Sequence, residues 1–177
     1  MPDHLYPFES RYADVDGARV HYVDEGTGPP LLMLHGNPTW SFLYRDLIKG
    51  LRDRFRCIAP DHPGFGISEA SPGYGFTPAE HASVLEGLVE QLGLTGVILM
   101  VQDWGGPIGF AVATRKPDRF AAFVIGNTWA WPKSDPGTQL FSRLLGGPIG
   151  GYLILRRNAF VERILPSNVK LRNLPVR

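Results

Sequence analysis

Several common features are scarce or missing in this sequence of 177 residues, and each absence excludes a class of protein. Cys57 is the only cysteine, so the chain cannot form an internal disulfide or a cysteine-based zinc site, and a reducing, cytoplasmic location is expected. The first ten residues carry charges and contain no apolar core, so no signal peptide is expected. No apolar stretch approaches the roughly 20 residues needed to span a bilayer.

Excess charge is missing as well. The formal net charge is +1 and charged residues make up 20% of the chain, so neither a nucleic acid nor a membrane surface is expected as a partner. Apolar residues make up 44%, which is typical of a soluble globular protein. A chain of this length can bury one real hydrophobic core.

The most informative stretch runs from Ile98 to Pro107. The apolar run 97–101 predicts a buried strand, and residues 108–115 predict a helix. A strand, a sharp turn and a helix, with a reactive residue at the turn, form a nucleophile elbow. Asp103 holds the nucleophile position, where the free N–H groups of a helix N-terminus favour a carboxylate. The alternative is that Asp103 only caps the helix.

Two further motifs lie upstream of this elbow. Residues 34–40 read LHGNPTW, and residues 59–66 read APDHPGFG. In the α/β-hydrolase fold, an HG motif after the third strand supplies one backbone N–H of the oxyanion hole, and the residue after the nucleophile supplies the other. Together with VQDWGG at 101–106, these motifs resemble the haloalkane dehalogenases, and the resemblance extends from about Leu5 to about Pro166.

The predicted elements agree with an α/β fold, because strand patterns alternate with helical patterns. Strands are predicted at 12–16, 18–24, 31–34, 55–59, 97–101 and 120–126, and helices at 40–51, 77–92 and 108–115. The resemblance implies an α/β-hydrolase-type, mostly parallel sheet with flanking helices, truncated after the sixth strand. Residues 1–127 are expected to form this incomplete core, and 128–177 a partial helical cap with an irregular tail.

The resemblance also implies roles for three residues. Asp103 would displace halide from a saturated carbon, giving an ester that water hydrolyses. The backbone N–H groups of Asn37 and Trp104 would form the oxyanion hole, while the Asn37 amide and the Trp104 indole N–H would hold the halide. The substrate would be a small halogenated alkane, without a metal or an organic cofactor. As ordinary alternatives, Asn37 is a turn residue and Trp104 a packing aromatic.

Other residues carry weaker predictions. An apolar substrate pocket could include Trp40, Phe65, Phe141 and Leu144, although large apolar residues are more often ordinary core. His35 is expected to be a structural histidine that bonds to the backbone. We expect His62 and His81 at the surface or in loops.

A catalytic base is absent from the expected position. The triad order in this fold is nucleophile, acid and then histidine, yet no histidine follows Asp103. The acids that follow it are Asp118, Asp135 and Glu162. The catalytic histidine and acid are therefore expected beyond Arg177, and the isolated chain is expected to be inactive.

Two alternatives remain open from the sequence. An epoxide hydrolase also uses an elbow aspartate, but it needs acidic donors, usually cap tyrosines, to protonate the opening oxygen. Tyr152 is the only tyrosine after Asp103. The second alternative is a catalytically incompetent fragment.

Overall fold

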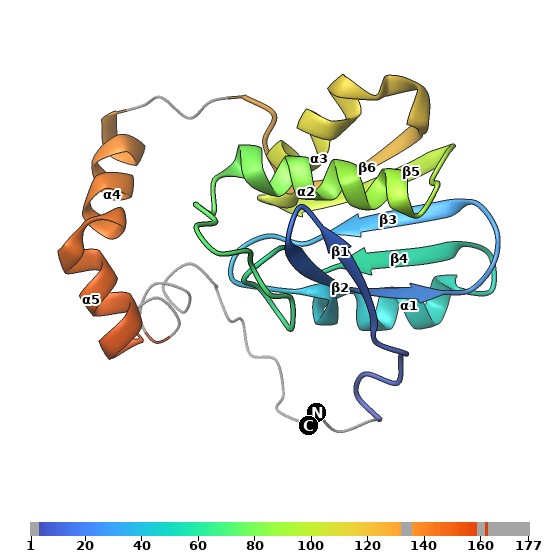
Figure 1. Ribbon diagram of the computed structural model, residues 1–177, viewed down its shortest axis with the longest axis horizontal. Helices are drawn as coiled ribbons and strands as arrows, with labels where there is room; N and C mark the ends of the chain where they lie inside the picture. Colours follow the sequence, from blue (N-terminus) through green and yellow to red (C-terminus); the bar gives the residue numbers. More distant parts are fainter. Residues whose placement is uncertain (1–3, 132–135, 159–161, 163–177) are drawn as a thin grey trace, which may run out of the picture. The chain divides into compact units, whose positions relative to one another are not determined.

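The computed structural model describes residues 4–131, 136–158 and 162 (Figure 1). The chain divides into two compact units, Met1–Trp131 and Pro132–Arg177. The larger unit holds a six-stranded sheet in the order β1-β2-β4-β3-β5-β6. Its strands are β1 (Arg11–Val15), β2 (Ala18–Glu25), β3 (Pro30–Leu34), β4 (Arg56–Pro60), β5 (Val97–Asp103) and β6 (Phe120–Thr128).

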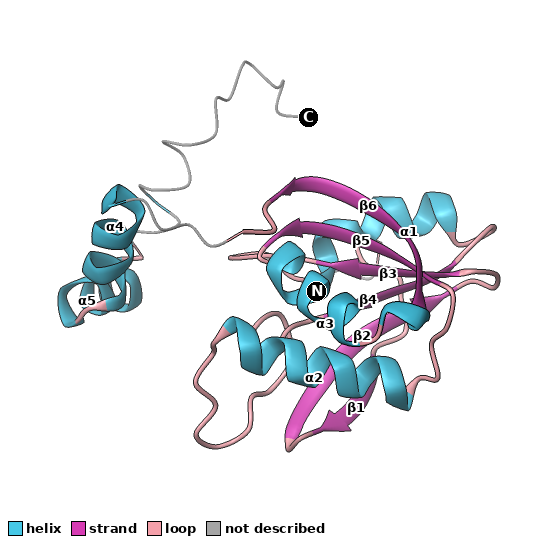
Figure 2. Ribbon diagram, turned by 90° about the horizontal axis from the view of Figure 1, so that it is seen from above, coloured by secondary structure: helices cyan, strands magenta, loops and turns pink. Residues whose placement is uncertain are grey.

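The sheet is mostly parallel. Strands β4, β3, β5 and β6 run parallel to one another, whereas β1 pairs with β2, and β2 with β4, in antiparallel register. Figure 2 shows β6 next to β5 at the outer edge of this sheet. The mostly parallel sheet expected from the sequence is therefore confirmed.

Helices cover both faces of the sheet. On one face lie the short 3₁₀ helix η1 (Ser41–Tyr44) and α1 (Arg45–Leu51), and on the other α2 (Pro78–Gln91) and α3 (Gly105–Arg115). Strand β3 shows why both faces must be covered, because its alternate side chains enter different cores. Leu32 and Leu34 pack with the α2 and α3 face, while Leu31 and Met33 pack with the α1 face.

Local sequence accounts for the start of α2. The Thr77 side chain accepts a hydrogen bond from the Glu80 N–H, and the Glu80 carboxylate accepts one from the Thr77 N–H. This capping box satisfies two N–H groups that the first helical turn would leave unpaired, and Pro78 has no N–H to lose. The sequence Thr-Pro-Ala-Glu at 77–80 is the pattern typical of such a box.

The second unit contains two described helices, α4 (Pro136–Gly146) and α5 (Pro148–Arg157). Gly147 separates them, and Pro148 opens the second helix. A Cβ atom at Gly150 would collide with the carbonyl oxygen of Leu145, so glycine permits α5 to approach the end of α4. No described helix has the length and apolar character needed to cross a membrane.

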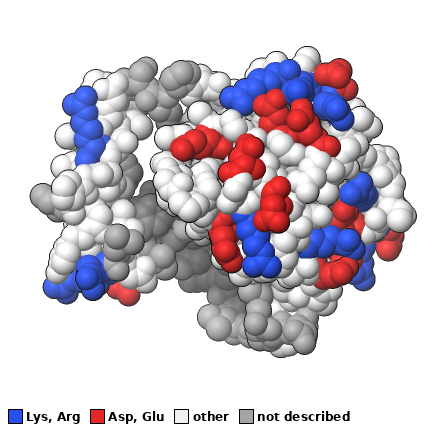
Figure 3. Space-filling view, in the orientation of Figure 1, with Lys and Arg blue, Asp and Glu red and all other residues white. Residues whose placement is uncertain are grey.

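The charges on the surface are mixed. Figure 3 shows Lys and Arg side chains next to Asp and Glu side chains on one face of the molecule. Arg115 and Lys116 both contact Glu86 through ion pairs, of 3.1 and 3.6 Å. Such exposed pairs contribute little stability.

Candidate active site

Asp103 lies at the sharp turn between β5 and α3. Its backbone φ is +51°, in the left-handed region that Asp tolerates better than most residues. Helix α3 begins at Gly105 rather than at the predicted residue 108, so the turn is shorter than the sequence predicts. A Cβ at Gly105 would collide with the Leu34 carbonyl oxygen, and one at Gly106 with the Thr128 hydroxyl. The two glycines therefore let α3 begin directly against β3 and β6.

The HG motif after β3 meets this turn. The Asn37 backbone N–H donates a hydrogen bond of 2.9 Å to Asp103 Oδ1. Gly36 makes the approach possible, because a Cβ there would collide with the Asp103 carboxylate. The two motifs that the sequence singled out are thus brought into direct contact.

Both predicted halide donors are exposed residues. The Trp104 side chain is 40% exposed, and its ring packs edge-on against Trp129 with 5.0 Å between centroids. Asn37 is an exposed residue. The side-chain roles of Asn37 and Trp104 in halide binding therefore stay predictions.

His35 of the HG motif lies close to two other histidines, His62 and His81. The ring centroids of His35 and His62 are 4.5 Å apart, and those of His62 and His81 are 5.4 Å apart. All three are buried, with exposed fractions of 0 to 5%. His62 lies in the loop after β4, as predicted, but it is buried rather than at the surface. The prediction for His81 is wrong, because His81 lies in α2 and is buried. The Gly- and Pro-rich composition around residue 62 suggested an exposed loop, whereas that loop folds back onto His35.

Hydrogen bonds hold these rings in place. His35 Nδ1 lies 2.9 Å from the Gly36 carbonyl oxygen, as expected for a structural histidine. The His62 N–H donates to His35 Nε2 at 3.0 Å, and the Tyr74 hydroxyl lies 3.0 Å from His81 Nδ1. Burial lowers the pKa of each ring, and that of His62 falls well below its usual value with a further contribution from His35.

Sequence reasoning missed a second buried group beside the HG loop. The Asp61 carboxylate is fully buried and accepts hydrogen bonds from His21 Nδ1 at 2.9 Å, the Ser41 N–H at 2.8 Å and the Ile67 N–H at 3.1 Å. Burial alone would raise the Asp61 pKa, but these hydrogen bonds outweigh it and lower the pKa. An acid placed directly after a buried strand was the available signal.

Two of the candidate pocket residues lie in the first unit, and the other two lie in the second. Trp40 is half-buried and stacks on Phe42 with 5.6 Å between ring centroids, and half-buried Phe65 packs against His35. Leu144 belongs to the second unit and is 60% exposed. The Phe141 side chain lies outside the described residues. A pocket built from all four stays a prediction.

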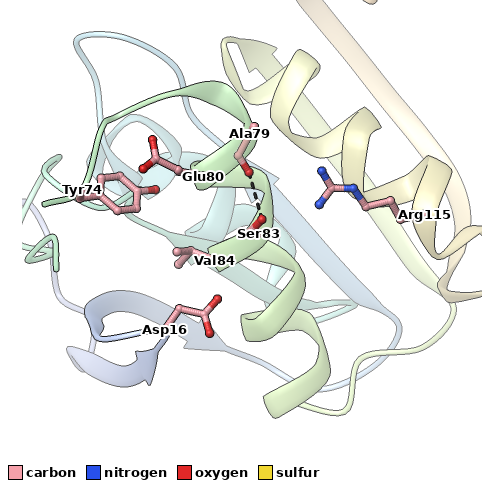
Figure 4. Close-up of a pocket in the computed structure, with 7 residues that line it drawn as sticks. All are labelled: Asp16, Tyr74, Ala79, Glu80, Ser83, Val84 and Arg115. Carbon is pink, nitrogen blue, oxygen red and sulfur yellow. Dashed lines mark hydrogen bonds between the residues drawn. The ribbon is translucent and has the colours of Figure 1, made fainter.

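A shallow cavity of about 310 Å³ lies elsewhere (Figure 4). It is lined by Tyr74 and the first turns of α2, by Asp16 and by Arg115. Arg115 ends the 11-residue helix α3 whose first turn follows Asp103, so about 15 Å of helix separates this cavity from the elbow. We therefore do not assign it to the chemistry of Asp103. Among the described residues, no cluster of three or more His, Cys, Asp or Glu side chains could hold a metal.

Comparison with known proteins finds a family and several relatives that are similar to this chain. A family model described as alpha/beta hydrolase fold matches residues 29–144. Haloalkane dehalogenase 2 of Mycobacterium tuberculosis strain H37Rv is 56% identical over 168 residues, which cover 95% of this chain and 59% of that protein. A cis-3-alkyl-4-alkyloxetan-2-one decarboxylase of Xanthomonas campestris is 44% identical over 186 residues, covering 93% of this chain and 62% of that protein.

Solved structures point the same way. A mutant of haloalkane dehalogenase DatA from Agrobacterium tumefaciens C58 superposes with a TM-score of 0.80 at 26% identity, covering 99% of this chain and 62% of that one. The chain spans about three fifths of the length of the proteins that it matches. The resemblance inferred from the motifs is confirmed. The chain therefore belongs to the alpha/beta hydrolase fold family, and within that family it is a haloalkane dehalogenase-like protein.

Proposed function

We propose that this chain carries the nucleophile and one oxyanion-hole donor of a haloalkane dehalogenase-type hydrolase. The observation that carries the proposal is the Asp103 carboxylate at an elbow with φ of +51°, held by the Asn37 N–H at 2.9 Å. An N–H bonded to one carboxylate oxygen orients the other for attack. The substrate is a small halogenated alkane, and its products are an alcohol, a halide ion and a proton.

The first step is a displacement at saturated carbon. Asp103 Oδ2 forms a bond to the carbon while the carbon–halogen bond breaks, and the halide leaves with the bonding electron pair. Oδ1, which accepts the Asn37 N–H, becomes the carbonyl oxygen of the resulting ester. The Asn37 amide and the Trp104 indole N–H receive the halide, since one hydrogen bond cannot replace the hydration of an anion.

The second step is hydrolysis of this ester. Water adds to the ester carbonyl, negative charge develops on Oδ1, and the Asn37 and Trp104 N–H groups stabilise it. Collapse of the intermediate releases the alcohol and restores the carboxylate. Water needs a general base for this attack at neutral pH. His35 has both ring nitrogens in hydrogen bonds, as does His21, so neither is poised to act on Asp103.

The base and its acid partner therefore come from outside residues 1–177 in this proposal. The isolated chain completes at most the first step, releasing one halide per molecule and keeping an alkyl group on Asp103. Intact mass after incubation with a bromoalkane tests this directly, with Asp103→Asn as the control that forms no adduct. Repeated turnover, or an adduct that survives in the Asn variant, would contradict the assignment.

Two other reactions should be assayed in parallel with the haloalkane reaction. An epoxide tests the hydrolase that shares an elbow aspartate, and a cis-disubstituted oxetan-2-one tests the reaction named for the Xanthomonas campestris relative. An Asp103 adduct with the epoxide alone, or consumption of the oxetanone alone, would replace the haloalkane assignment. No reaction with any of the three would identify the chain as a catalytically incompetent fragment.

A further inference from the structure

The Asn37 N–H that contacts Asp103 belongs to the same peptide group as the Gly36 carbonyl. The carbonyl oxygen accepts hydrogen bonds from the Thr39 N–H and the Thr39 hydroxyl, each at 3.0 Å, and lies 2.9 Å from His35 Nδ1. A peptide group is planar, so holding its oxygen also fixes the direction of its N–H. The contacts on Gly36 therefore determine whether the Asn37 N–H points at Asp103.

The backbone N–H of His62 holds His35 in one protonation form. The His62 backbone N–H donates to His35 Nε2 at 3.0 Å, so this nitrogen must carry a lone pair. A neutral imidazole then carries its proton on Nδ1, which donates to the Gly36 oxygen. The His62 ring completes the arrangement by donating from Nε2 to the His35 carbonyl oxygen at 3.2 Å.

We propose that His35, held in its Nδ1-protonated form by His62, is a positioning residue that keeps the Asn37 N–H directed at Asp103. The proposal rests on the function proposed above, since it assigns that N–H to the oxyanion hole. His35 touches neither the carboxylate nor the substrate in this scheme. It acts through one peptide group, from the face opposite the reacting atoms.

This positioning requires a neutral ring. Protonation would place a second N–H on Nε2, facing the His62 N–H at hydrogen-bond distance, and two donors cannot share that contact. The ionisable groups around His35 are Asp61 and Asp103, which favour the charged form, and His62 and His81, which disfavour it. Burial is the largest effect and lowers the His35 pKa, so the arrangement holds at neutral pH and fails in acid.

The test compares two replacements of His35 in the full 177-residue chain. Asparagine can offer its side-chain N–H near the position of Nδ1, and leucine has similar bulk without a donor. The readouts are the proton shift of the Asn37 backbone amide by ¹⁵N NMR and the rate at which a bromoalkane alkylates Asp103. A hydrogen bond to a carboxylate moves an amide proton downfield.

We expect the Asn37 signal to stay downfield in His35→Asn and to move upfield in His35→Leu. Alkylation should slow by roughly tenfold or more in the leucine variant and recover in the asparagine variant, because misplacing the attacking group costs rate. Because burial lowers the His35 pKa, the Asn37 signal of the unaltered chain should move upfield only at a pH lower than the ordinary histidine value of about 6.5, and His35→Asn should lose that titration. His81→Asn, which keeps every contact on Gly36, should leave the neutral-pH signal in place.

The outcomes separate this inference from the proposed function. A downfield Asn37 signal in His35→Leu would overturn the positioning role, and so would an unchanged acid titration in His35→Asn. If His35→Leu does not fold, the titration of His35→Asn against the unaltered chain decides the matter. If the Asn37 signal behaves as expected but no bromoalkane alkylates Asp103, the proposed function fails and the positioning role of His35 stands.

Discussion

The Asn37 N–H and the Asp103 carboxylate lie 2.9 Å apart although 66 positions separate the two residues in the sequence. The contact joins the loop after β3 to the turn after β5, and these strands are neighbours in the sheet. In parallel strands, residues at the carboxyl ends meet at one edge, where open α/β sheets place their sites. Two short motifs thereby become one site.

Gly36→Ala should disrupt this contact. The new Cβ would collide with the Asp103 carboxylate, so either the carboxylate or the Gly36–Asn37 peptide must move. We expect loss of the Asp103 adduct with a bromoalkane and a fall of about 1–3 kcal/mol in the free energy of unfolding. Urea unfolding and intact mass provide the two measurements.

The matched control is Gly50→Ala in α1. No atom lies within 4 Å of a Cβ at that position, and alanine favours the helix. The unfolding free energy should stay constant or rise by up to about 1 kcal/mol, with adduct formation unchanged. Equal behaviour of the two variants would contradict the close approach of Gly36 to Asp103.

The elbow conformation predicts different results for two replacements of Asp103. Asparagine accepts a left-handed backbone and can accept the Asn37 N–H, so Asp103→Asn should retain native stability while losing the adduct. A β-branched residue is strained at a φ of +51°, so Asp103→Val should lower the unfolding free energy by a further 1–2 kcal/mol or so. Equal stability of the two variants would show that the turn does not impose this conformation.

Local features were predictable from the sequence because their physics is local. The capping box of α2 needs only Thr77 and Glu80, three residues apart. The continuous apolar run of β3 predicts burial on both faces, which the two hydrophobic clusters confirm. The sequence pattern predicts too late a start for α3, because Gly105 and Gly106 are poor helix formers. These glycines are needed instead for the close approach of α3 to β3 and β6.

The buried polar groups were not predictable in the same way. His21 and Asp61 are 40 positions apart, and their hydrogen bond exists only because β2 and β4 are neighbours. His62 lies in a segment whose glycines and prolines indicate a loop, and only packing against His35 shows that it is buried. A sequence pattern reports the polarity of a residue, but these burial sites depend on tertiary partners.

Asp61 should be important for stability. It accepts a backbone N–H bond from Ser41 at the start of η1, another from Ile67 in the loop after β4, and a ring N–H from His21. Asp61→Ala leaves these donors without a partner and should cost about 3–5 kcal/mol of unfolding free energy. Glu69→Ala is the control, because its ion pair with Arg19 is exposed and 3.4 Å long, and it should change stability by less than about 0.5 kcal/mol.

The buried histidines predict loss of stability in mild acid. His35, His62 and His81 have lowered pKa values, so the unfolded chain takes up protons at a higher pH than the folded chain. Their stabilising contribution is complete above about pH 6.5 and declines as the pH falls below it, by up to about 1.4 kcal/mol per pH unit for each histidine. Asp61, whose pKa is also lowered, adds a further loss below about pH 4.

Urea unfolding at several pH values between 8 and 5 measures this effect. The result is the slope of the unfolding free energy against pH. His62→Leu should reduce the slope by about one proton, because it removes one of the three titrating rings. A flat profile between pH 7 and 5 would mean that these rings take up protons in the folded chain as readily as in the unfolded chain.

The outer edge of β6 should make the 177-residue chain self-associate. The strand has no charged residue from Phe120 to Thr128, and Phe123, Val124 and Ile125 are 47%, 44% and 62% exposed. It pairs only with β5 among the described residues, so a row of backbone N–H and C=O groups faces outward beside apolar side chains. Such an edge is a template for another strand, and a lysine placed on it opposes pairing through desolvation and charge repulsion.

Ile125→Lys should therefore shift the chain toward monomer in sedimentation velocity without lowering its stability, since Ile125 is already mostly exposed. Tyr152→Lys adds the same charge at a 56% exposed position on α5 and should leave the association unchanged. A chain that stays monomeric as its concentration rises, or two variants with equal effects, would show that β6 is not the associating edge.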